Sequence, residues 1–187
     1  MADNKKDPKK VFSFRFNLSW LYFLLLIGVG YLLFSNQRSA APEKYVERFA
    51  KAGASMISFH YEAAREGSAA LIEKIQDLGV KAGIVINPDC PVQDIFPYLH
   101  QVDFVLLMSV FAGFGGQKFI PATLERVRTV RAELDRMGRL GVPIEVDGGI
   151  GPENAGVVVA AGAEILVAGS AVFKAEDPEA AIAKMRI

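Results

Sequence analysis

Hydrophobic positions from Pro42 onward follow two alternating spacings. Short apolar runs typical of buried strands recur, and each is followed by a segment with apolar residues three or four positions apart, as on one face of a helix. Continuous apolar strands that alternate with helices predict a parallel sheet covered by helices. Five strands are expected, in the sequences SMISFH (55–60), KAGIVINP (81–88), VDFVLLMSV (102–110), VPIEVDGGI (142–150) and EILVAGSAVF (164–173). Helical segments are expected at 43–54, 67–79, 92–99, 121–138, 151–163 and 177–187.

The first 40 residues have a different pattern. No charged residue occurs from Phe16 to Gln37, a span of 22 residues. About 20 apolar residues in a helix cross a bilayer core, and Trp20, Tyr22 and Tyr31 suit the two interfaces. A signal peptide has a shorter apolar region and a small-residue cleavage site, and a buried helix needs a surrounding core. The segment is therefore predicted to be an uncleaved transmembrane anchor.

Flanking charge predicts the orientation and the domains. The basic residues Lys5, Lys6, Lys9, Lys10 and Arg15 precede the segment, and only Arg38 and Lys44 follow it closely. The positive-inside rule then predicts a single-pass membrane protein with a cytoplasmic amino terminus. The domains are a basic tail (1–15), an anchor in the lipid bilayer (16–37), a linker (38–41) and a partial barrel (42–187). Residues 1–37 resemble the anchor of bacterial AAA-type zinc metalloproteases, but no protease motif follows.

Composition narrows the function classes. The 187 residues suffice for one medium domain. The 21 basic and 21 acidic residues give zero net charge, so no nucleic-acid partner is expected. The single cysteine, Cys90, excludes an internal disulfide.

Three glycine-bearing turns follow successive predicted strands: GFGG at 113–116, DGGI at 147–150 and AGSA at 168–171. Glycines let backbone N–H groups approach an anion closely, and the start of a following helix adds partial positive charge. A phosphate held beyond the last two strands recurs in (β/α)8 barrels. Together the three turns predict phosphate binding.

Five stretches also carry a family resemblance: SFHYEA, KAGIVINP, LLMSV followed by GFGGQKFIP, IEVDGGI, and EILVAGSAVF. In order and spacing they resemble ribulose-phosphate 3-epimerases over Pro42 to Ile187. One departure is Phe111-Ala112, where that family usually has Asn-Pro. The resemblance implies an α/β fold that is an incomplete TIM (β/α)8 barrel with about five parallel strands, here preceded by one transmembrane helix.

The resemblance also implies chemistry. Such enzymes interconvert ribulose 5-phosphate and xylulose 5-phosphate through an enediolate, using two aspartates and a divalent metal, usually zinc, with iron and manganese as alternatives. Asp147 would be a metal ligand and one of the two acid–base groups, with Met108 near the reacting centre. The residues matched to the pentose phosphate's phosphate group are Gly113, Phe114, Gly115, Gly116, Gly148, Gly149, Gly169 and Ser170.

Several family residues have no match in this sequence. The family's first three strands supply a serine, two metal-binding histidines and the other catalytic aspartate. Only His60 and His100 are present here, and His60 matches a family position that is not a metal ligand. A catalytic zinc normally has three protein ligands. Glu62 is a conceivable substitute, and Asp147 alone could simply cap its turn.

Three hypotheses remain open. The chain is an epimerase that completes its site in a homo-oligomer, since a five-stranded sheet leaves two strand edges unpaired. Alternatively, it is a non-catalytic, membrane-tethered phosphosugar-binding module. As a third alternative, it joins two unrelated gene fragments, with a junction between codons 36 and 44.

Overall fold

A computed structural model describes residues 42–113 and 115–187. The predicted basic tail, anchor and linker lie outside these residues, as does Phe114. Within the two described ranges, no helix combines the length and apolar character needed to cross a membrane.

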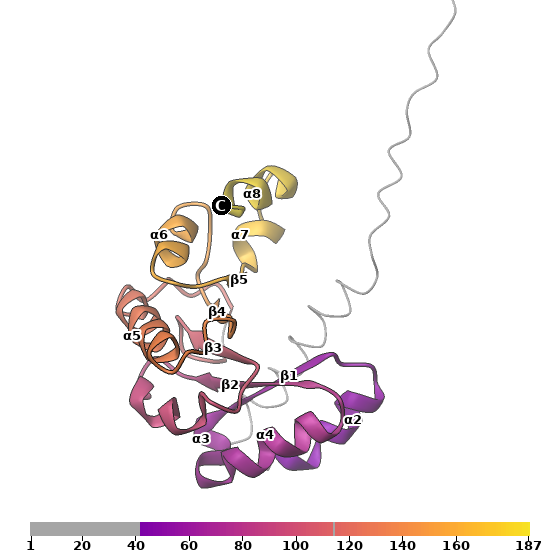
Figure 1. Ribbon diagram of the computed structural model, residues 1–187. Coiled ribbons are helices and arrows are strands. Elements are labelled where there is room, and N and C mark those ends of the chain that lie inside the picture. Colours follow the sequence, from indigo (N-terminus) through magenta and orange to yellow (C-terminus); the bar gives the residue numbers. More distant parts are fainter. Residues whose placement is uncertain (1–41, 114) are drawn as a thin grey trace, which may run out of the picture.

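The described residues form an α/β fold with one sheet of five parallel strands, as the apolar runs predict (Figure 1). The strands are β1 (Met56–His60), β2 (Lys81–Ile86), β3 (Phe104–Met108), β4 (Ile144–Asp147) and β5 (Ile165–Val167). Each pairs with the next strand along the chain, which places β1 and β5 at the two ends of the order. In the described part of the chain the sheet is therefore open.

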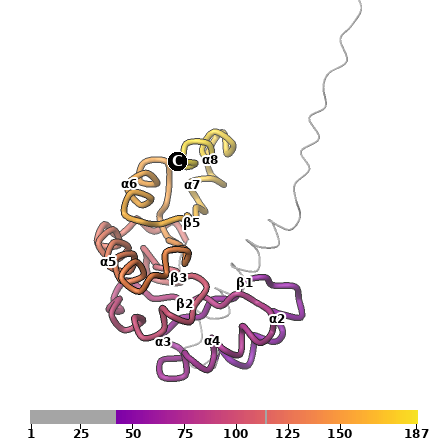
Figure 2. Tube along the Cα trace, in the orientation of Figure 1, coloured from indigo at the N-terminus to yellow at the C-terminus, as the bar shows by residue number. Residues whose placement is uncertain are grey.

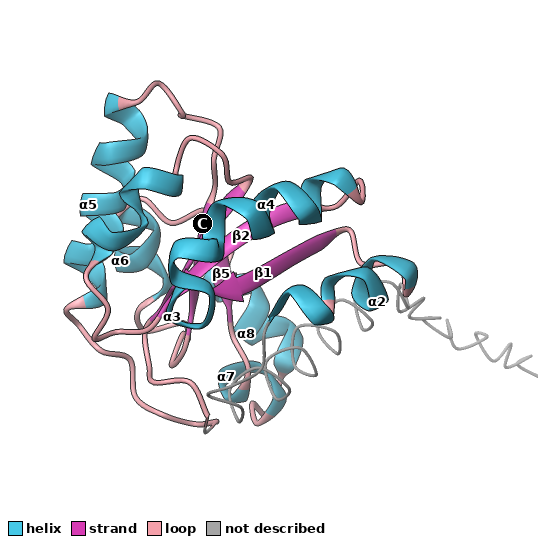
Figure 3. Cartoon of the chain, turned by 90° about the horizontal axis from the view of Figure 1, so that it is seen from below, coloured by secondary structure: helices cyan, strands magenta, loops and turns pink. Residues whose placement is uncertain are grey.

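Helices connect the strands and cover one face of the sheet. The α-helices are α2 (Val46–Lys51), α3 (Tyr61–Ala64), α4 (Ser68–Asp77), α5 (Thr123–Arg136), α6 (Ala155–Ala160), α7 (Ser170–Phe173) and α8 (Pro178–Met185). The 3-10 helices are η1 (Pro42–Lys44), η2 (Arg65–Gly67) and η3 (Val92–Tyr98). The trace follows an arc from α2 to α8 (Figure 2). Seen from below, α4 lies over β2, while α5 and α6 lie side by side (Figure 3).

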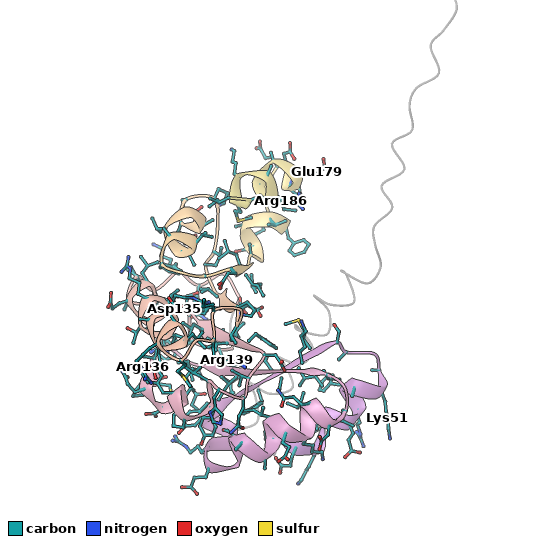
Figure 4. The ribbon with its side chains drawn as sticks, in the orientation of Figure 1. Lys51, Asp135, Arg136, Arg139, Glu179 and Arg186 are labelled. Atoms are coloured by element: carbon teal, nitrogen blue, oxygen red, sulfur yellow. The ribbon has the colours of Figure 1, made fainter. Side chains whose placement is uncertain are left out.

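Alternation along the strands separates two faces. Ile84 and Ile86 of β2 and Leu107 of β3 join the large core beneath the helices, to which α4 contributes Ile72 and Ile75. The intervening residues Val85, Leu106 and Met108 form a second, smaller buried cluster with Val110 on the opposite face. This is the period of two that a strand imposes. Charged side chains such as Lys51 of α2 and Arg136 of α5 lie on the outer helical layer (Figure 4).

Two local expectations were wrong. The chain after β1 forms α3 and η2, where no helix was expected, and Glu62 of α3 accepts a hydrogen bond from Asn87 N at 2.8 Å. The predicted last strand, 164–173, is only three residues long. It ends before Gly169, whose carbonyl accepts hydrogen bonds from Val172 N and Phe173 N at 3.0 Å, and these bonds begin α7.

Asp177 caps α8, so its replacement is expected to weaken the last helix. Its carboxylate accepts a hydrogen bond from Ala180 N at 3.0 Å. Asp177→Ala should therefore lower the free energy of unfolding by about 1 kcal/mol. Urea denaturation measures the loss, and Asp177→Asn, which retains an acceptor oxygen, should lose less. Equal losses would contradict a capping role.

Candidate functional site

The loops that hold the candidate residues follow neighbouring strands. In a parallel sheet all carboxyl ends lie along one edge, where parallel α/β folds bind their ligands. The turn containing Gly113 follows β3, Gly148 and Gly149 follow β4, and Gly169 follows β5. The strand order thus brings the three predicted turns to one edge.

The turn after β4 packs closely against the loop after β3. Gly148 and Gly149 have φ of +125° and +61°, values that side-chain-bearing residues rarely adopt. Ser109, which is buried, donates its Oγ–H to Gly148 O at 2.6 Å and its N–H to Asp147 O at 2.8 Å. Its own carbonyl accepts from Ile120 N at 2.9 Å. The two loops are therefore one connected unit, with Ser109, which the sequence analysis did not single out, at its centre.

Asn154 braces the same turn from the other side. Its Oδ1 accepts from Gly151 N at 2.9 Å, and its Nδ2 donates to Gly149 O at 2.9 Å. Side-chain amides that bond nearby backbone groups fix tight turns in this way. The turn containing Gly149 is thus held on both sides.

The loop after β3 is folded back on itself. Gly113 and Gly116 have φ of +133° and +76°. Gln117 Nε2 donates to Phe111 O at 2.6 Å, which closes the chain across the glycines. Phe114 lies outside the described residues. The loop thus places several glycine backbone positions beside the end of β3.

Asp147 ends β4 on the face opposite the large core, and its register partner is Met108 of β3. Burial raises the pKa of Asp147 to about 6. A carboxyl group with a pKa near neutrality can both accept and return a proton at pH 7. Glu145, two residues earlier on the same face, is only 5% exposed. Burial, with a further contribution from the charge of Asp147, raises the pKa of Glu145 to about 7.

A second polar cluster lies at the carboxyl ends of β1 and β2. His60 Nδ1 lies 3.5 Å from Glu62 Oε2 and 3.4 Å from Asn87 Nδ2. Burial acts to raise the pKa of Glu62, but the interaction with His60 and the hydrogen bond from Asn87 N outweigh it and hold that pKa below its ordinary value. Glu62 is therefore a carboxylate fixed between two strand ends, on the side of the site away from Asp147.

Arg126 of α5 secures the loop after β2, and its loss is expected to be costly. Its guanidinium donates to the carbonyls of Asn87 at 2.8 Å, Pro88 at 3.0 Å and Cys90 at 2.6 Å. Because Arg126→Met leaves these carbonyls without their donor, the free energy of unfolding should fall by about 2 kcal/mol. Arg128→Met on the same helix is the control, since Arg128 forms an exposed ion pair with Glu125 and its loss should cost almost nothing. Equal urea midpoints for the two variants would contradict this role.

The third predicted turn is more open. Val167 of β5 pairs with Asp147, which places Gly169 and Ser170 beyond the neighbouring strand end. Both residues are exposed, and Ser170 begins the four-residue helix α7. Among the described residues, the hydrogen bonds of these two join them to α7 and not to the other turns. The structure thus connects the first two turns and leaves the third beside them.

The described residues do not by themselves form the expected metal centre. A catalytic zinc takes three protein ligands. Across 42–113 and 115–187, no group of three His, Cys, Asp or Glu side chains is placed to hold a metal ion. Asp147 has the right chemistry for one ligand, but it does not form a complete site with its neighbours.

Comparisons with known proteins identify the family. The model of the "Ribulose-phosphate 3 epimerase family" matches residues 39–173. The ribulose-phosphate 3-epimerase of Bacillus subtilis is 46% identical over 145 residues, which cover 78% of this chain and 66% of that protein. The cytoplasmic isoform of ribulose-phosphate 3-epimerase from Oryza sativa is 42% identical, covering 78% and 63%. The chain thus spans slightly less than two thirds of these relatives' length.

Structural comparison supports the fold. The crystal structure of a 3-hexulose-6-phosphate synthase superimposes with a TM-score of 0.59 at 22% identity, covering 79% of this chain and 68% of that one. At this identity the likeness concerns the TIM-barrel-like fold alone. The expected α/β architecture is confirmed at that level.

The predicted membrane location is wrong by these comparisons. The curated relatives are epimerases, and the rice relative is named as a cytoplasmic isoform. The family match begins at residue 39, so it gives no support to the anchor resemblance of residues 1–37. The predicted bilayer contact of residues 16–37 lies outside the described residues.

Proposed function

Because the chain belongs to the ribulose-phosphate 3-epimerase family, we propose that it binds a pentose phosphate at the carboxyl ends of β3, β4 and β5. Asp147 exchanges a proton with the bound sugar. The reaction is the interconversion of ribulose 5-phosphate and xylulose 5-phosphate. The observation that carries the proposal is Asp147, with a pKa raised to about 6, directly before the braced glycine turn.

The glycine turns support the proposed binding of the substrate's phosphate group. Gly148 and Gly149 adopt positive φ and lie against the loop that holds Gly113 and Gly116. Backbone N–H groups exposed by such turns bind phosphate oxygens without adding a full positive charge. The zero net charge of the chain is compatible with this mode, since it needs no basic cluster.

Asp147 supports the proton-transfer part of the proposal. In one direction Asp147, as the acid, would give a proton to one face of the carbon being inverted, and in the reverse direction its carboxylate would take the proton from that face. Inversion also needs a base on the other face that takes a proton from the same carbon. Glu62, an ionised carboxylate on the far side of the strand ends beside His60, is our candidate for that base among the described residues.

Binding without turnover is the second candidate function. It is favoured by the lack of a three-ligand metal group among residues 42–113 and 115–187. A phosphosugar-binding module would need the glycine turns but no metal. The two functions share one binding site and differ only in reaction.

A coupled ribulose 5-phosphate epimerisation assay with added zinc or iron tests the proposal. Turnover that disappears in Asp147→Asn would support the enzyme. Calorimetry with ribulose 5-phosphate should then be run on any inactive sample. Binding without turnover would leave the second function, and a folded protein that neither binds nor reacts would refute both. Sequencing across codons 36 to 44 tests the separate hypothesis of joined fragments.

A further inference from the structure

Asn87 follows β2 and connects four parts of the candidate site. Its N–H donates to Glu62 Oε1 of α3 at 2.8 Å, and its carbonyl accepts from Arg126 of α5 at 2.8 Å. Its side-chain Nδ2 lies 3.4 Å from His60 Nδ1, and its Oδ1 accepts from Ala112 N at 3.4 Å. The backbone and the side chain of Asn87 therefore both make polar contacts, and these contacts go to different elements.

The contact to Ala112 is the one that bears on phosphate binding. Ala112 directly precedes Gly113, the first glycine of the loop after β3. That loop is tied at its ends through Ser109 and Ile120, and within itself by Gln117 and Phe111. Asn87 holds the stretch between these ties from the neighbouring strand. Its side chain thus contacts the residue directly before the first glycine.

The backbone of Asn87 is fixed by hydrogen bonds that do not involve its side chain. Glu62 holds its N–H and Arg126 holds its carbonyl, and both partners are part-buried. A side chain on a fixed backbone loses little entropy when it bonds to a loop. A neutral amide also suits position 87. A carboxylate there would be repelled by the negative charge of Glu62 and by that of an incoming phosphate.

We propose that Asn87 is a positioning residue that holds the Ala112 amide, and so the glycine loop after β3, ready for the phosphate group of the ligand. This inference rests on the proposed pentose-phosphate site. It assigns to Asn87 no contact with the substrate. It predicts a selective effect on phosphorylated ligands.

The test compares Asn87→Leu, which keeps the shape but removes the amide, with Gln76→Leu. Gln76 has an equivalent amide near the amino end of β3, away from the candidate site. Its Nε2 donates to Gln101 O at 2.8 Å and to Asp103 at 3.1 Å. Amide hydrogen exchange of the free protein should speed up about tenfold at Ala112 in Asn87→Leu and stay unchanged there in Gln76→Leu. Asn87→Ala replaces the leucine variant if that protein does not fold.

Calorimetry with ribulose 5-phosphate and with unphosphorylated ribulose gives the second readout. Affinity for the phosphorylated sugar should fall about tenfold in Asn87→Leu, while affinity for ribulose is retained. Unchanged exchange at Ala112 would overturn the inference, and so would an equal loss for both sugars. If the wild-type protein binds neither sugar, the proposed function fails, while hydrogen exchange still decides whether Asn87 positions the loop.

Discussion

Replacing Gly149 with alanine is expected to lower the free energy of unfolding by about 4 kcal/mol and to push the two glycine turns apart. A Cβ built at this position would lie 2.4 Å from Phe119 N and 2.9 Å from Gln117 O. Both atoms belong to the backbone, so no rotamer change relieves the overlap. The positive φ of +61° adds its own penalty. The loop after β3 must therefore move, and phosphate affinity should fall with stability.

Gly79→Ala is the matched control for Gly149→Ala. Gly79 has a similar φ of +73°, but a Cβ there would meet nothing within 4 Å. It should lose only about 1 kcal/mol, the penalty for the backbone conformation alone. Urea denaturation of the two variants measures the difference, which isolates the contact between the turns. Equal losses would mean that the loop after β3 does not pack on Gly149 in solution.

Periodicity in the sequence predicted the sheet because each strand carries its own signal. Apolar runs bounded by glycine and proline placed all five strands, and strand order then brought the turns at Gly113 and Gly148 to one edge. The close approach of Gly149 to Phe119 was not predictable. It joins residues 30 positions apart (149 − 119), and the local sequence around either residue does not predict a contact with the other.

The polar residues that organise the site were missed for the same reason. Arg126 lies on a helix with four arginines, TLERVRTVRAELDR, in which nothing separates it from its exposed neighbour Arg128. Asn87 and Ser109 look like ordinary residues at strand ends. Their roles depend on partners 20 to 40 positions away, such as Glu62 for Asn87 and Gly148 for Ser109. By contrast, the glycine turns were predicted because each follows directly on a strand, and Asp147 was singled out because a family motif contains it.

Glu145 is expected to make the protein less stable as the pH rises. It is 5% exposed, and burial, with the charge of Asp147 second, raises its pKa from 4.5 to about 7. Between these values the folded state binds more protons than the unfolded state, so stability is greatest below pH 4.5 and declines as the pH rises through 7. The shift corresponds to about 3 kcal/mol lost by pH 8. Asp147, with a pKa raised to about 6, adds to the decline in the same direction.

Glu145→Gln removes the buried charge and should flatten this profile. Urea denaturation from about pH 4 to about pH 8 should show the variant as stable as the parent at the acidic end and more stable by about 3 kcal/mol at the alkaline end. Glu133→Gln is the control: Arg136 lowers the pKa of Glu133, so its contribution changes only below 4.5 and the decline should persist. A parent protein whose stability rises with pH would show that Glu145 is paired or hydrated in solution. The strand face that carries Asp147 would then be more polar than its burial implies. The pKa of Asp147, which is raised by burial on that face, would then be expected nearer its ordinary value.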